Sequence, residues 1–104
     1  MEFVFEVTDK TGRKIHLSKE RLKHIQRHPH MQDSIENLKL TLTNPTATRY
    51  DEIDKKIVYF YKEFKEMNSS KRYLLVSVKY LNEEGFIITS FFTNKITGLK
   101  WKTK

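Results

Sequence analysis

Two histidines one helical turn apart are the residues of this sequence best suited to chemistry. His24 and His28 lie four residues apart, and Arg21 precedes His24 by three residues. In an α-helix these spacings put the three side chains in one row on one face. One neutral imidazole can accept the proton of a ribose 2′-hydroxyl while a protonated group donates a proton to the departing 5′-oxygen. The row is therefore suited to cleaving an RNA phosphodiester.

Two other interpretations of this pair stay open. Histidines four apart also occur as zinc ligands, but the segment lacks the glutamate of an HExxH motif and the chain contains no cysteine. We therefore expect no metal site and no cofactor. A histidine can also have a structural role, capping a helix or filling a polar position at the edge of a core. His16 and His30 belong to no pattern and are expected at the surface.

A second candidate lies in the apolar segment Gly85–Phe91, where Thr89 and Ser90 introduce two hydroxyls. A buried hydroxyl needs a hydrogen-bond partner or a ligand. If residues 82–85 form a plain four-residue hairpin loop, Thr89 lies opposite Val78 and the two sides of the sheet can be assigned. One side then carries Thr89, Tyr59 and Tyr61, and the other carries Lys62, Ser77, Lys79 and Ser90. A one-residue bulge would reverse this assignment.

The histidine row needs a helix to hold it. Ser18 is a good N-cap, and Pro29 disfavours helical backbone at the residue before it, so the first helix should run from Ser18 to near His28. Apolar residues at helical spacing predict a second helix over residues 31–43, which Asn44-Pro45 ends.

The remaining elements are predicted to be strands. Alternating apolar residues, or runs rich in β-branched and aromatic residues, predict strands over residues 3–7, 14–17, 47–50, 57–64, 73–81 and 86–93. A turn at Asp9–Gly12 joins the first two, and a short basic tail surrounds Trp101. The predicted fold class is α+β, with two N-terminal helices packed on a twisted antiparallel sheet of about four to six strands.

Length and composition limit the alternatives further. The chain of 104 residues is long enough for a single domain, residues 1–104, and 38% hydrophobic residues can form a modest core. No apolar run approaches the roughly 20 residues that span a bilayer, and the first nine residues do not form a cationic leader. We expect a cytoplasmic protein that does not enter a membrane.

The positive charge is concentrated in two stretches. The formal net charge is +7, and residues 10–30 carry seven cations against the single acid Glu20. Residues 71–104 carry seven cations against two acids. Such a surface attracts polyphosphates through counterion release, which makes nucleic acid the leading partner class. The same charge can also be incidental, since many small basic proteins are simply soluble.

The order of these motifs resembles a known family. The segments IHLSKERLKHIQRHP (from Ile15), YLLVSVK (from Tyr73) and GFIITSFFT (from Gly85) are similar to the phage-type nuclease-fold domains of the Barnase–EndoU–colicin–RelE group. The likeness covers about Ile15 to Thr93, with one departure, since His30 follows Pro29 where an acidic residue is expected. Many relatives in that group are ribonucleases or ribonuclease toxins, small α+β domains with two N-terminal helices on an antiparallel sheet.

The resemblance implies metal-independent RNA cleavage by attack of the 2′-hydroxyl, which leaves a 2′,3′-cyclic phosphate. The residues expected to be catalytic are His24, His28 and Thr89, and those expected to bind substrate are Arg21, Arg27, Tyr59, Tyr61 and Lys79. RNA is the expected partner, and an inhibitor or antitoxin protein is a further candidate. Two alternatives remain: a non-catalytic RNA- or DNA-binding module with the same basic face, and a small interaction protein.

The charge distribution predicts RNA binding that depends strongly on salt. If about six phosphates are contacted, affinity should fall by about 10³-fold or more between about 50 and 200 mM salt, because bound cations are released from the nucleic acid. Fluorescence anisotropy with labelled RNA measures this directly. Affinity that is unchanged by salt, or no binding at low salt, would contradict it.

Overall fold

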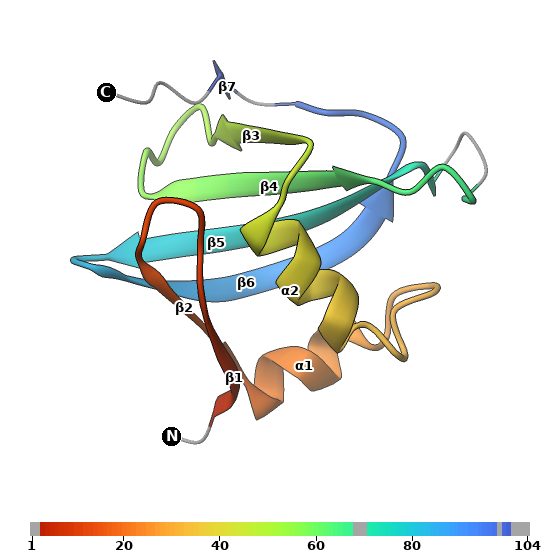
Figure 1. The fold of residues 1–104 in the computed structure, drawn as a ribbon, viewed down its shortest axis with the longest axis horizontal. Coiled ribbons are helices and arrows are strands. Elements are labelled where there is room, and N and C mark those ends of the chain that lie inside the picture. The colour runs from red at the N-terminus through yellow and green to blue at the C-terminus, as the bar shows by residue number, and fades with distance from the viewer. Residues whose placement is uncertain (1–2, 68–70, 98, 101–104) are drawn as a thin grey trace.

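The computed structural model describes residues 3–67, 71–97 and 99–100, which form one mixed sheet and two helices (Figure 1). Seven strands lie in the order β1-β2-β6-β5-β4-β3-β7 within this described part of the chain. The elements in chain order are β1 (Phe3–Thr8), β2 (Lys14–Ser18), α1 (Lys19–Ile25), α2 (Ile35–Thr43), β3 (Ala47–Tyr50), β4 (Ile57–Glu63), β5 (Tyr73–Leu81), β6 (Glu84–Thr93) and β7 (Leu99–Lys100).

The predicted fold class was wrong in its arrangement. The chain begins with the β1–β2 hairpin, so α1 follows two strands and the helices are not N-terminal. The sheet also has seven strands and is not purely antiparallel, because β2 pairs with β6 in parallel. A parallel pair requires a long crossover, and here that crossover contains both helices and strands β3 to β5. The N-terminal hairpin therefore adds two strands to the sheet, next to β6.

Most element positions agree with the prediction, and the differences occur at the ends of the helices. Ser18 caps α1 as predicted, accepting a hydrogen bond from the Arg21 amide at 3.2 Å. The helix ends at Ile25, however, three residues before His28, and α2 begins at Ile35. Between them His30 adopts a left-handed backbone with φ 66°, a conformation that cannot continue a helix. The tail predicted around Trp101 falls outside the described residues, although β7 pairs with β3 just before it.

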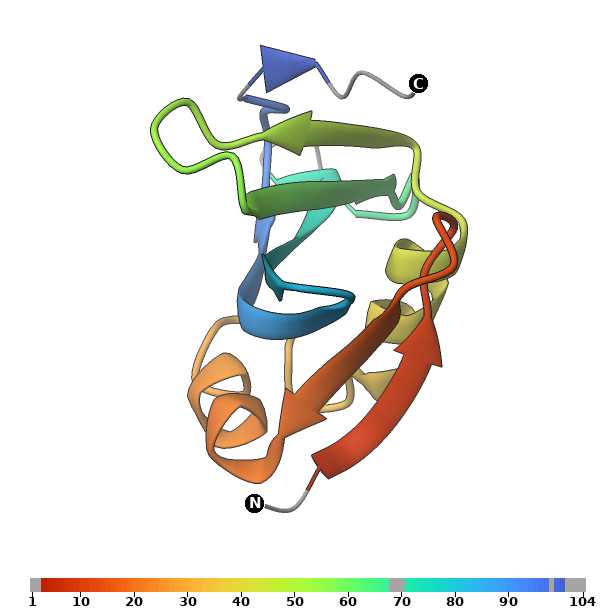
Figure 2. The same ribbon diagram turned by 90° about the vertical axis from the view of Figure 1, so that its left-hand side faces the viewer.

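The core lies between one face of the sheet and α2. Its side chains come from five strands, from both helices and from the loop between them; the largest fully buried ones are Ile15, Leu17, Ile25, Met31, Leu38, Leu42, Val58, Phe60, Leu74, Val76 and Val78. In Figure 2, α2 lies on the right of the sheet, whereas α1 lies at the lower left, beyond β6. The face of β4, β5 and β6 that points away from α2 is called the outer face below.

Gly85 allows β2 to join the sheet. It lies opposite Ile15 in the parallel β2–β6 ladder and opposite Tyr80 in the β5–β6 ladder. A Cβ at this position would come within 2.5 Å of the Ile15 side chain and 2.8 Å of the Val78 side chain. Any other residue would force these buried side chains to shift, so glycine is the residue that fits this position.

A buried aspartate fixes the β1–β2 turn. Asp9 is 4% exposed, and one carboxylate oxygen accepts hydrogen bonds from the Thr11 amide at 2.8 Å, the Thr11 hydroxyl at 2.6 Å and the Arg13 amide at 3.0 Å. The other oxygen accepts the hydroxyl of Tyr80, and the Arg13 guanidinium lies 3.6 Å over the Tyr80 ring. Burial, followed by this hydrogen bond, raises the pKa of Tyr80. The turn is thereby attached to β5.

Neither helix in the described part of the chain has the length and apolar character needed to cross a membrane.

Replacing Asp9 should destabilise the fold. Asp9→Ala leaves two backbone amides and the Tyr80 hydroxyl without an acceptor, and we expect the free energy of unfolding to fall by about 2–4 kcal/mol. Urea denaturation followed by circular dichroism measures the change. The matched control is Asp51→Ala, which removes a similar set of hydrogen bonds at a more exposed site and should cost less. Equal losses in the two variants would contradict the role given to burial.

Candidate active site

A one-residue bulge in β6 decides which hydroxyl reaches the outer face. Next to the β5–β6 turn, Lys79 pairs with Phe86 and Val78 with Ile87, but Ser77 pairs with Thr89, so Ile88 is the extra residue. Continuing the first register would place Thr89 opposite Val76, in the core. The bulge instead puts Thr89 on the outer face.

Ser90, the other hydroxyl of this strand, lies in the core. It is fully buried, and its side chain donates a hydrogen bond to the carbonyl oxygen of Leu75 at 2.6 Å. Its role is thus structural, and Thr89 is the hydroxyl left for a ligand.

Three hydroxyl side chains lie side by side across the outer face. Tyr59 pairs with Ser77 in the β4–β5 ladder, and Ser77 pairs with Thr89 in the β5–β6 ladder. The prediction that Thr89 shares a side with Tyr59 and Tyr61 is confirmed by this register. The prediction that Ser77 and Lys79 lie on the opposite side is wrong for two reasons. The bulge in β6 brings Thr89 opposite Ser77, and β4 pairs with β5 one residue away from the predicted register, with Glu63 and not Phe64 opposite Tyr73.

Helix α1 lies along β6 beside Thr89. The β2–β6 ladder ends at Phe86, and the chain then leaves β2 directly into α1. Arg21 donates a hydrogen bond from Nη1 to the Ile88 carbonyl oxygen at 3.4 Å, and the His28 ring lies 5.5 Å from the Phe91 ring. Thr89 falls between these two contacts along the strand.

The histidine row is continuous and faces solvent. The rings of His24 and His28 meet edge to face, with centroids 5.7 Å apart. Arg21 and His24 are exposed and His28 is half-buried. Arg27 is exposed in the turn that follows α1, where its amide donates to the His24 carbonyl oxygen at 3.3 Å. The predicted helical row therefore forms, although His28 lies just beyond the helix end.

The other predicted substrate-binding residues lie farther along the outer face and have partners. Tyr61 is 2% exposed, and its hydroxyl contacts the Thr97 side chain at 3.3 Å. Lys79 pairs with Asp54 at 3.4 Å. The Tyr59 hydroxyl donates to the Asp51 carboxylate. Each of these three side chains is therefore engaged by another residue of the protein.

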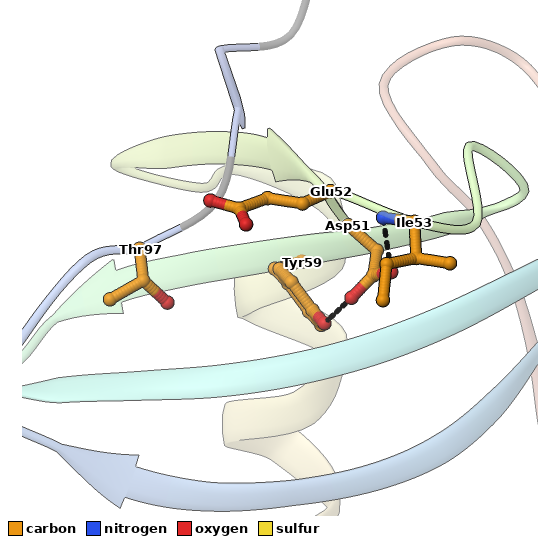
Figure 3. A pocket seen from close by; sticks show the side chains of 5 residues that line it. All are labelled: Asp51, Glu52, Ile53, Tyr59 and Thr97. Atoms are coloured by element: carbon orange, nitrogen blue, oxygen red, sulfur yellow. Dashed lines mark hydrogen bonds between the residues drawn. The ribbon is translucent and has the colours of Figure 1, made fainter.

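Tyr59 lines an acidic hollow of the surface. This hollow of about 320 Å³ is formed by Asp51, Glu52, Ile53, Tyr59 and Thr97 (Figure 3). The hydrogen bond to Asp51 raises the pKa of Tyr59 to about 12, and the same bond lowers the pKa of Asp51. Two carboxylates at its rim disfavour a polyanion, so this hollow is poorly suited to nucleic acid.

His16 was predicted to lie at the surface, and that prediction is wrong. Its side chain is 5% exposed, because β2 is an inner strand and the ring is enclosed by Phe3 and Phe86 at centroid distances of 4.6 and 5.3 Å. Its Nε2 lies 2.7 Å from a Glu84 carboxylate oxygen. No signal in the sequence indicated this burial, because alternation puts His16 on the face opposite Ile15 and Leu17, and only the pairing with β6 makes β2 an inner strand. His30 is exposed, as predicted.

The described residues contain no group of three or more His, Asp or Glu side chains placed to hold a metal ion.

Comparison with protein families gave a match over almost the whole chain. The matching family model is described as phage-Barnase-EndoU-ColicinE5/D-RelE like nuclease2, and it aligns with residues 4–103. Comparisons with curated proteins and with solved structures gave no match.

The Tyr59–Asp51 pair predicts an unusual titration. In the parent protein Tyr59 should ionise with a pKa of about 12, because the Asp51 carboxylate favours the neutral phenol that donates to it. Asp51→Asn should move this pKa toward the ordinary value of 10.0. Nuclear magnetic resonance of the tyrosine rings, assigned with Tyr59→Phe, measures it.

Glu52→Gln is the control, because Glu52 contributes least to the shift and its removal should leave the pKa nearly unchanged. A parent Tyr59 that ionises at the ordinary value would show that the bond to Asp51 does not persist in solution.

Proposed function

The chain belongs to the phage-Barnase-EndoU-ColicinE5/D-RelE like nuclease2 family, and on that basis we propose that it is a metal-independent RNA endonuclease. The match confirms the family resemblance predicted from the sequence, and it supports a nuclease-like domain. The observation that supports the more specific proposal is the row of Arg21, His24 and His28, which contacts β6 at Ile88 and at Phe91, before and after Thr89.

The proposed reaction uses the two imidazoles as base and acid. One neutral imidazole takes the proton from the ribose 2′-hydroxyl, whose oxygen forms a bond to phosphorus. The bond from phosphorus to the 5′-oxygen breaks, and the other imidazole, protonated at the start, gives its proton to that oxygen. The products are a 2′,3′-cyclic phosphate and a free 5′-hydroxyl, and the protonation states of the two histidines are exchanged.

The neighbouring groups would hold the phosphate. A phosphate over Thr89 can accept a hydrogen bond from its hydroxyl and a charge-assisted bond from the Arg21 guanidinium, whose planar fork matches phosphate oxygens. Arg27 supplies a second cation at the other end of the row. Developing negative charge in the transition state is thus met by cations and a hydroxyl, without a bound metal.

Thr89 is proposed as the catalytic hydroxyl, and Tyr59, Tyr61 and Lys79 receive smaller roles than the sequence predicted. The hydroxyls of the two tyrosines are engaged by Asp51 and Thr97, and Lys79 by Asp54. They line the outer face and shape it, whereas Arg21 and Arg27 are the proposed phosphate ligands.

An inhibitor or antitoxin protein that blocks cleavage would have to cover this cationic row. Acidic side chains on such a partner would complement Arg21, Arg27 and Lys23, which are exposed on or just after α1. Action on RNA also suits a cytoplasmic location.

The histidine row gives the central test. His24→Ala or His28→Ala should reduce cleavage of labelled RNA by roughly 10²–10⁴-fold, measured in EDTA with end-group analysis of the products. The parent should show a bell-shaped dependence of rate on pH, with both limbs in the range where imidazoles titrate. RNA binding should be largely retained, because the arginines and lysines supply the electrostatic attraction.

The matched control is His30→Asn, since His30 is exposed outside the row and asparagine tolerates its left-handed backbone. This variant should cleave like the parent. If the double variant of His24 and His28 also cleaves like the parent, the histidines are not catalytic. If the parent binds RNA and never cleaves it, the chain is a binding module.

A further inference from the structure

A second hollow of the surface adjoins the histidine row and has a different character. It measures about 160 Å³ and is lined by Phe3, His16, Ser18, Arg21, Phe86 and Ile87. Three of these residues, Phe3, His16 and Phe86, have aromatic side chains. Arg21 belongs both to this hollow and to the row with His24 and His28 that is proposed to cleave RNA. We call it the aromatic pocket.

The rings of this pocket are held in place. The rings of Phe3, His16 and Phe86 form a cluster. The centroid distances are 4.6 Å from Phe3 to His16, 5.3 Å from His16 to Phe86 and 6.3 Å from Phe3 to Phe86, and Phe3 is 40% exposed. His16 is anchored through Nε2, 2.7 Å from Glu84, and its Nδ1 is 3.3 Å from Glu6 without the alignment of a hydrogen bond. A fixed and partly exposed aromatic surface is the feature on which nucleic-acid bases stack.

The charges around the pocket determine how a nucleotide would enter. Arg21 stands at the wall shared with the row and attracts phosphate, whereas Glu6 and Glu84 flank the buried ring of His16 and repel it. A nucleotide therefore fits in one direction, with its base against the rings and its phosphate toward Arg21. The small volume suits one base and excludes a base pair.

We propose that the aromatic pocket is a nucleobase subsite that holds one unpaired base next to the phosphate to be cleaved. The inference rests on the proposed function for the position of the phosphate, and it adds the substrate class: a single strand, with at least one base turned out of any stack. Double-stranded RNA would not present a base to this pocket, because its bases are paired inside the helix.

The test compares a short oligonucleotide with and without the base in question. The probes are a single-stranded deoxydinucleotide, which lacks the 2′-hydroxyl and cannot be cleaved by the proposed reaction, and the same molecule with one abasic position. Removing the base at the correct position should weaken binding by about 5- to 150-fold, the range measured for one base–aromatic stack. In Phe3→Leu and Phe86→Leu this difference between the two probes should largely disappear.

The matched control is Tyr73→Leu, which removes an aromatic ring from the outer face at the opposite end of β6 and should keep the full difference. Phe3 is 40% exposed and lies outside the core, so Phe3→Leu remains informative if Phe86→Leu unfolds in a thermal melt. Equal binding of the two probes by the parent would overturn the subsite. So would a base preference that persists in a folded Phe3→Leu variant.

A separate cleavage assay keeps this proposal distinct from the proposed function. A base preference that depends on Phe3, in a protein that cleaves nothing, supports the pocket and overturns only the chemistry. Cleavage by a protein that binds the abasic probe as well as the intact one overturns only the pocket. If a free nucleoside monophosphate binds as tightly as the dinucleotide, the pocket does not require a base that is part of a strand, and the proposal is also overturned.

Discussion

The insertion of Ile88 into β6 is the constraint on which the candidate site depends. Because side chains alternate between the two faces of a strand, one extra residue exchanges the faces of everything that follows it. Here it sends Ser90 into the core, where a backbone carbonyl satisfies its hydroxyl, and it sends Thr89 to the outer face. The carbonyl oxygen of the inserted residue accepts the hydrogen bond from Arg21. A single irregularity thus selects the hydroxyl and contributes to positioning the helix beside it.

Two aspartate–tyrosine pairs have the same hydrogen-bonding pattern, one of them buried and the other at the surface. Asp9 and Asp51 each accept backbone amides of a turn and the hydroxyl of a tyrosine in a neighbouring strand. The first pair is buried and ties the N-terminal hairpin to β5. The second is at the surface and holds the loop after β3. In both, the tyrosine hydroxyl donates to the carboxylate, and this hydrogen bond contributes to raising the pKa of the tyrosine.

Local sequence patterns were sufficient for much of the fold. The turn at Asp9, the cap at Ser18 and the strands from Ala47 onward depend on short-range preferences, and the structure has them close to the predicted positions. The parallel pairing of β2 with β6 could not be predicted, because it joins segments about seventy residues apart and depends on the absence of a side chain at Gly85. His16 was misplaced for the same reason, since an inner strand buries both of its faces.

The candidate site shows the same division. The spacing of Arg21, His24 and His28 predicted the row, because helical periodicity is a local property. The side of the sheet that carries Ser77 and Lys79 depended on the register between β4 and β5 and on the bulge in β6, and neither has a strong signal in this sequence. Tyr61 has a hydroxyl that could bind a phosphate, but only the packed structure shows that this side chain is buried and that its hydroxyl contacts Thr97.

Ser18 belongs to β2 and to the cap of α1 at once, so strand and helix are joined without a hinge. Any rotation of the helix about this junction would have to break the cap bond, the pairing of Ser18 with Phe3 or the hydrogen bond from Arg21 to the Ile88 carbonyl oxygen. The sheet thus fixes the orientation of α1 relative to β6, and no ligand is needed to establish it. A substrate would meet the imidazoles already in place, and little of its binding energy would be consumed in ordering the protein.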